Sequence, residues 1–130
     1  MEVEIGPNSS VCLAKWSAGE LGAGDRRGEY LWVESAAGQI AGNRHFFVEI
    51  KDLAREKPPV KVNWRQQGDN LIAELSSPAY AYFVWLFVPL EGTRYSDNWI
   101  DLPADERRSI TITPPAGKKV TPEMVQIGWR

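Results

Sequence analysis

Apolar and polar residues alternate with a period of two along most of this chain. The clearest runs are Val60–Arg65 and Ser109–Thr113, in which every second side chain is apolar. This period is typical of β-strands that bury one face, and it differs from the longer period of a helix. Glycine or proline breaks the pattern at intervals of roughly ten residues, as in all-β sandwiches. The pattern therefore predicts an all-β protein with almost no helix.

The alternating runs and the breaks between them define the strands that we expect. These are Glu2–Ile5, Ser10–Trp16, Glu29–Ser35, Arg44–Ile50, Val60–Arg65, Asn70–Leu75, Tyr80–Val88, Ser109–Thr113 and Met124–Trp129. Strands of this spacing predict an antiparallel β-sandwich of about 7–9 strands. No internal repeat, linker or low-complexity tract interrupts the sequence, so we expect a single domain that spans residues 1–130.

The longest expected strand, Tyr80–Val88, is apolar on both faces. One face carries Ala81, Phe83, Trp85 and Phe87, and the other carries Tyr80, Tyr82, Val84, Leu86 and Val88. A strand of a two-layer sandwich normally has one wet face. We expect Phe83, Trp85 and Phe87 to contact another domain or a sugar, because an exposed aromatic patch marks an interface or a ligand surface.

Composition and charge exclude several classes of partner. The chain has 130 residues and a formal net charge of −2, from 15 basic and 17 acidic side chains. This charge does not support binding to nucleic acid or to an anionic membrane. No apolar run approaches the ~18 residues of a membrane span, and the first residues lack the pattern of a signal peptide. Because a strand-like run begins directly after Met1, we expect the chain to be an excised part of a larger protein.

The sequence offers few parts for catalysis or for binding a cofactor. His45 is the only histidine, so a zinc site or a serine or cysteine nucleophile with a histidine base is incomplete. The only cysteine, Cys12, can form no internal disulfide, and its apolar surroundings predict that it is buried. No phosphate-binding glycine motif is present. We therefore expect no metal and no cofactor.

Paired carboxylates in the stretch RYSDNWIDL raise the question of sugar cleavage. A glycosidase needs two carboxyl groups at roughly 5–10 Å, which Asp97 and Asp101, or Asp101 with Asp105 or Glu106, could provide. A turn is favoured instead, because Ser, Asp and Asn side chains bond to their own backbone, and calcium would need more oxygen ligands. We expect a structural corner. Its residues are Tyr95, Asp97, Asn98, Trp99 and Asp101.

Three stretches resemble the C-terminal immunoglobulin-like domain of β-mannosidases in family 2 of the glycoside hydrolases. They are YFVWL at Tyr82–Leu86, YSDNWIDL at Tyr95–Leu102 and SITIT at Ser109–Thr113. The family's pattern is an apolar strand, an aromatic-Ser-Asp-Asn corner with Asp-Leu, and a proline-containing turn before a Val- or Thr-rich strand. The resemblance is dense over residues 79–113. The turn at 103–106 is one residue shorter than the family's and lacks its glycine.

The resemblance implies an immunoglobulin-like fold and a parent enzyme whose acid and nucleophile are glutamates on a separate (β/α)₈ barrel. Such a barrel needs about 200 residues or more, so this chain does not contain one. We therefore expect a non-catalytic accessory domain that braces or caps the barrel, with the other domains of the parent as its partners. Two alternatives stay open. One is a carbohydrate-binding module that stacks exposed Trp or Tyr on sugars, and the other is a small enzyme that uses Asp97 and Asp101.

Overall fold

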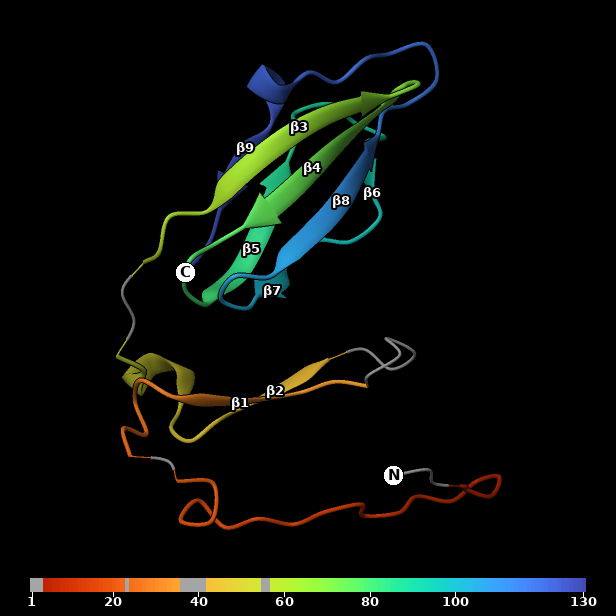
Figure 1. Cartoon of the computed structure of the whole chain (residues 1–130). Coiled ribbons are helices and arrows are strands. Elements are labelled where there is room, and N and C mark those ends of the chain that lie inside the picture. Colours follow the sequence, from red (N-terminus) through yellow and green to blue (C-terminus); the bar gives the residue numbers. More distant parts are fainter. Residues whose placement is uncertain (1–3, 23, 36–41, 55–56) are drawn as a thin grey trace. The chain divides into compact units, whose positions relative to one another are not determined.

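The chain divides into two compact units, Met1–Arg55 and Glu56–Arg130, in a computed structural model that describes residues 4–22, 24–35, 42–54 and 57–130. Every described element is a β-strand or a single turn of 3₁₀-helix (Figure 1). The predicted all-β class is therefore confirmed. The single domain over residues 1–130 stays a prediction.

The first unit contains a two-stranded antiparallel sheet. β1 (Tyr30–Val33) pairs with β2 (Asn43–Phe46), and a 3₁₀ turn, η1 (Ile50–Asp52), follows. Trp32 of β1 lies against Gly42, where an added Cβ would come within 2.3 Å of the indole ring. None of the described residues between 4 and 54 is fully buried, so their sheet has no enclosed core of its own.

Three expectations for the first unit are wrong. Ser10–Trp16 forms no strand. Residues 4–5 of the expected strand Glu2–Ile5 form none either, and residues 2–3 lie outside the described part. A strand needs a neighbour for its backbone N–H and C=O groups, and among the described residues these runs have none. Cys12 is exposed rather than buried, because the described residues around it form no sheet that could bury it.

The second unit is a sandwich of two antiparallel sheets (Figure 1). The larger sheet has the order β3-β4-β8-β6, and its strands are β3 (Lys61–Gln67), β4 (Asn70–Ser76), β8 (Arg107–Thr113) and β6 (Arg94–Tyr95). The smaller sheet has the order β7-β5-β9, and its strands are β7 (Ile100–Leu102), β5 (Ala81–Phe87) and β9 (Gln126–Gly128). A 3₁₀ turn, η2 (Pro122–Met124), precedes β9. Four strands packed on three are typical of an immunoglobulin-like sandwich.

The hairpin between β3 and β4 shows how the sequence sets the register of the larger sheet. Gln67 pairs with Asn70, so only Gly68 and Asp69 form the loop. Gly68 has a φ of +59°, a left-handed conformation that glycine adopts without a steric penalty. Two-residue loops of this kind match the twist of the strands that they join.

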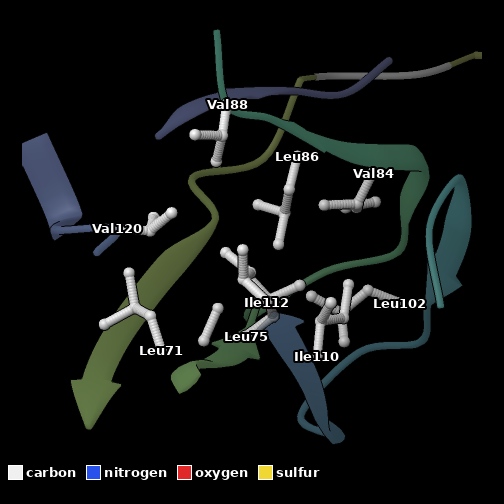
Figure 2. Close-up of a cluster of buried hydrophobic side chains, with 11 residues drawn as sticks. Leu71, Leu75, Val84, Leu86, Val88, Leu102, Ile110, Ile112 and Val120 are labelled. Carbon is white, nitrogen blue, oxygen red and sulfur yellow. The ribbon is translucent and has the colours of Figure 1, made fainter. Parts of the chain in front are cut away.

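The core of the second unit lies between its two sheets (Figure 2). Leu71 and Leu75 of β4 and Ile112 of β8 come from the larger sheet, and Val84 and Leu86 of β5 come from the smaller one. All five are at most 2% exposed. Burying such a side chain stabilises the fold by about 1.5–3 kcal/mol. This shared core orients β5, so that Phe83 and Phe87 are exposed and Trp85 is half-buried.

A bulge in β5 changes which of its side chains face the core. β5 pairs with β7 at Ala81–Leu102 and at Val84–Ile100, and the register shifts between these pairs. Phe83, inside the bulge, has a φ of +55°. As a result Ala81 is fully buried with Val84, whereas strict alternation predicted it beside Phe83 on the other face. The extra residue of a bulge is what breaks the alternation.

Candidate functional site

Aromatic side chains gather on the outer face of the smaller sheet. Phe83 and Phe87 of β5 are 37% and 50% exposed, and Trp99, next to β7, is 56% exposed. Trp85 is half-buried. The ring centroid of Trp99 lies 5.6 Å from that of Phe83 and 5.8 Å from that of Trp85. The aromatics that we expected to contact a domain or a sugar thus lie at the surface, and Trp99 joins them.

Two of these aromatic residues have a left-handed backbone. The φ angles are +55° for Phe83 and +58° for Trp99. Bulky L-residues rarely adopt this conformation, which costs about 1–3 kcal/mol and persists only where the surroundings impose it. Strain of this kind clusters at functional sites. Its presence at both residues makes this surface the candidate site.

Polar side chains of the corner hold the two strained residues. Phe83 N–H donates a hydrogen bond to Oδ1 of Asp101, at 3.3 Å. Trp99 N–H donates to Oδ1 of Asn98, at 3.0 Å. The same Asn98 amide reaches β5, where Nδ2 donates to the carbonyl oxygen of Leu86 and Oδ1 accepts from Leu86 N–H. The Asn98 side chain therefore takes the place of a strand neighbour beside β5.

The start of the corner connects the two sheets. Val88 N–H, directly after β5, donates to the hydroxyl oxygen of Tyr95, at 2.8 Å. Ser96 N–H donates to the carbonyl oxygen of Thr111 in β8, and Thr111 N–H donates back to Oγ of Ser96, both at 2.9 Å. Asp97 Oδ1 accepts from Asn98 N–H, at 2.8 Å. These bonds fix the turn from which Trp99 projects.

A glycine in the neighbouring strand positions the half-buried tryptophan. Trp85 pairs with Gly128 of β9, and a Cβ added to Gly128 would come within 2.3 Å of the indole ring. The ring therefore lies directly on the backbone of β9, in space that any other residue would occupy. β9 is extended beyond Gly128 by two backbone hydrogen bonds between Arg130 and Tyr82, of 2.8 and 2.9 Å.

Two separate clefts open on this part of the molecule. The first, called the Trp99 cleft below, has a volume of about 320 Å³ and is lined by Tyr82, Phe83, Trp85, Trp99 and Arg130. The second, called the Phe87 cleft, has a volume of about 350 Å³ and is lined by Phe87, Val88, Pro89, Leu90, Glu91, Thr93 and Tyr95. The two linings share no residue. The first cleft is lined by aromatic residues and one arginine, and the second combines aliphatic and aromatic residues with Glu91 and Thr93.

The second unit also matches a known family. The profile of Ig_mannosidase, an Ig-fold domain, covers residues 56–127, which is more than half of the chain. The chain belongs to this family. The match confirms both the resemblance seen in the sequence and the immunoglobulin-like sandwich. None of the curated proteins matches the chain.

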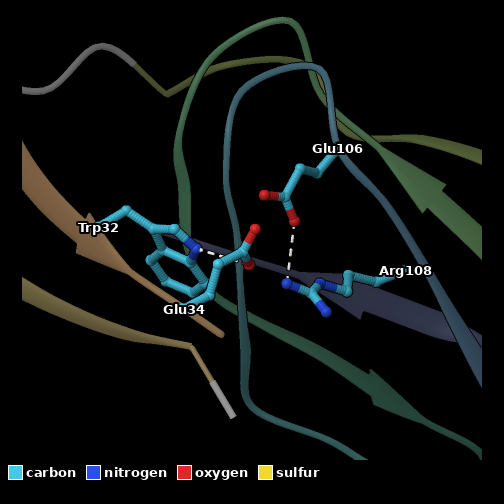
Figure 3. Close-up of polar contacts among 4 residues, drawn as sticks. All are labelled: Trp32, Glu34, Glu106 and Arg108. Carbon is cyan, nitrogen blue, oxygen red and sulfur yellow. Dashed lines mark hydrogen bonds and ion pairs between the residues drawn. The ribbon is translucent and has the colours of Figure 1, made fainter. Parts of the chain in front are cut away.

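The two carboxylates of the corner in this Ig_mannosidase chain have structural partners. Asp97 and Asp101 accept hydrogen bonds from backbone amides, as described above, and neither lines the two clefts. Figure 3 shows two further carboxylates with partners, one in each unit. Glu106 pairs with Arg108 at 2.9 Å, and Glu34 accepts a hydrogen bond from Nε1 of Trp32 at 3.0 Å.

Other kinds of site receive no support from the described part of the chain. No cluster of three or more His, Cys, Asp or Glu within it could hold a metal ion. None of its helices is long and apolar enough to cross a membrane. His45 lies edge-on to the ring of Phe47, with centroids 5.5 Å apart.

The sequence did not reveal Trp99 and Arg130 as parts of the Trp99 cleft. Trp99 was assigned to a corner, and the structure places its ring in solvent beside Phe83 and Trp85. The sequence does not point to Arg130, because its backbone pairing with Tyr82 follows only from the register of β9. Gly128 opposite a strand tryptophan was the one available signal, since glycine within a strand often marks a close approach.

Proposed function

We propose that this Ig_mannosidase domain is a non-catalytic accessory domain of a β-mannosidase-type glycoside hydrolase of family 2. In this proposal it braces or caps the catalytic barrel of the same polypeptide. The observation that carries the proposal is the family match over residues 56–127. The corner and the paired carboxylates support it, because these polar groups bind the domain's own backbone rather than facing a cleft together.

The Phe87 cleft has the chemistry of a contact between domains. Phe87 is 50% exposed, and the cleft continues over Pro89 and Leu90, with Glu91 beside them. Exposed apolar surface of this kind marks an interaction site, and contacts between domains of one chain combine such a patch with a polar edge. The proposed occupant is an apolar side chain from the catalytic barrel.

The parent assignment is tested on the complete polypeptide that contains this chain. We expect it to hydrolyse an aryl β-mannoside, while the 130-residue chain alone does not. A complete polypeptide without a glycosidase module would overturn the assignment.

The docking assignment is tested by placing a charge in the Phe87 cleft. Phe87→Asp in the complete polypeptide should lower the temperature at which the catalytic module unfolds, because a buried unpaired carboxylate is costly. Calorimetry measures this shift. The matched control is Trp99→Asp, which introduces the same charge at a residue of similar exposure in the other cleft. Equal shifts for the two variants would contradict docking through Phe87.

A further inference from the structure

We propose that the Trp99 cleft binds a pyranose ring of a mannose-containing oligosaccharide. This goes beyond bracing the barrel, and it assigns a ligand to a cleft that the docking proposal leaves free. The choice of mannose rests on the proposed function, and the choice of a pyranose ring rests on the cleft itself. Four features carry it: the ring faces, the strained backbone that presents them, the arginine that lines the cleft with them and the size of the cleft.

The aromatic rings of the cleft form a curved wall. Trp85 and Trp99 are inclined by 33°, and Phe83 is inclined to Trp99 by 59°. One face of a β-mannopyranose carries three axial C–H groups, which are weakly positive. The face of an aromatic ring is negative, so the two faces attract each other. A sugar that stacks on one ring can therefore touch the next with its edge.

The backbone strain is used to present these rings. Phe83 and Trp99 are both left-handed, and their backbone N–H groups donate hydrogen bonds to the side chains of Asp101 and Asn98, respectively. An aromatic side chain that served only the core would not need an exposed position and a strained backbone together. Such a combination is expected where a rigid surface is prepared for a ligand before it binds.

Arg130 gives the cleft its polar group. Its backbone is paired with Tyr82, which places the residue beside the rings, and it lines the cleft. A guanidinium offers five N–H donors for sugar hydroxyl oxygens. An apolar protein side chain in the same cleft would take water from this charge without replacing its hydrogen bonds, which is costly. The cleft volume of about 320 Å³ is within the range of small-molecule sites.

The test is isothermal titration calorimetry of the 130-residue chain with β-1,4-mannotetraose. We expect saturable binding of the tetrasaccharide and none of mannitol, which has similar hydroxyl groups and no ring. Trp99→Ala should weaken binding by about five- to tenfold, the loss expected for one aromatic contact. Arg130→Gln should weaken it about threefold, since its side chain keeps two of the donors.

Phe87→Ala is the matched control, because Phe87 is an exposed aromatic of the same strand that lines the other cleft. It should leave the affinity unchanged. Circular dichroism establishes that each variant is folded, and Trp99→Phe, which keeps an aromatic face, should retain binding if Trp99→Ala does not fold. Absence of heat at about 10 mM tetrasaccharide, or equal losses for Trp99→Ala and Phe87→Ala, would overturn the sugar site. Neither result bears on docking through Phe87.

Discussion

The side-chain amide of Asn98 is paired with the backbone of Leu86 through two hydrogen bonds. Nδ2 donates to the Leu86 carbonyl oxygen at 2.8 Å, and Oδ1 accepts from Leu86 N–H at 2.9 Å. Both bonds are partly buried, so the backbone groups of Leu86 have little access to water if Asn98 is removed. Leu86 is itself 2% exposed and belongs to the core.

Asn98→Ala should therefore lower the free energy of unfolding by about 2–3 kcal/mol, because two backbone groups lose their partner. Asn98→Asp keeps the acceptor and loses the donor, so its effect should be intermediate. Urea denaturation measures both. The control is Asn63→Ala on the exposed face of β3, which should change stability by less than about 0.5 kcal/mol. Equal effects at the two positions would contradict the role of Asn98.

Gly128→Ala should destabilise the second unit by about 1–3 kcal/mol, since the new methyl group overlaps the Trp85 ring. The ring has to move away from β9, so tryptophan emission should shift as well. Gly24→Ala is the control, because the nearest atom to its added Cβ is 3.9 Å away. An unchanged melting temperature for Gly128→Ala would show that Trp85 moves freely.

Tyr95→Phe should destabilise the second unit by about 1–2 kcal/mol, because Val88 N–H loses its acceptor in a partly buried place. Amide hydrogen exchange provides the local measurement. The Val88 amide should exchange faster in the variant. The Leu86 amide is an internal control, since Asn98 remains to accept its hydrogen bond. Unchanged exchange at Val88 would count against the contact.

The carboxylate of Glu20 closes a turn in the first unit, and its pKa reports on that turn. Oε2 accepts from the backbone N–H and from the hydroxyl of Ser17, both at 2.7 Å, as in a capping box. The backbone bond and then the hydroxyl bond lower the pKa of Glu20 below its ordinary value of 4.5. A lowered pKa in the folded state means that the turn is stabilised above the ordinary pKa. That stabilisation is lost as the pH falls through the lowered value.

Ser17→Ala should raise the pKa of Glu20 only part of the way to 4.5, because the larger contribution comes from the backbone N–H of residue 17, which alanine retains. A pH titration followed by NMR at Glu20 measures this. Glu123 serves as the control, since its pKa is lowered by the hydroxyl of Thr121 and by its own backbone. It should not respond to Ser17→Ala, and a common shift of both groups would point to a global change.

Periodicity predicted the long regular strands, because the alternation of buried and exposed side chains is set within each strand. β3 and β8 alternate cleanly, and Gly68 in the Gln67–Asn70 turn marks the hairpin between β3 and β4. β6 and β7 were missed, since strands of two and three residues are too short to show a period. Ser10–Trp16 was predicted wrongly, because periodicity does not indicate whether a partner strand exists.

The candidate site was only partly visible in the sequence. The aromatic residues of β5 predicted that one of its faces contacts a ligand or another domain. This prediction needs only the rule that a strand of a sandwich normally has one buried and one solvent-facing side. The bulge at Phe83 could not be predicted from the sequence. It depends on the shifted register between β5 and β7 and on the hydrogen bond from Phe83 N–H to Asp101 of β7. The exposure of Trp99 follows from its left-handed backbone, which tertiary contacts impose and which local preference would oppose.

The contact between Trp85 and Gly128 has an evolutionary consequence. The two residues share one volume on the face of β9, so the size of one limits the size of the other. Across homologues, a side chain larger than hydrogen at position 128 should occur only together with a smaller residue at position 85. The pair should therefore vary as a unit in an alignment, although 43 positions separate its members in the chain.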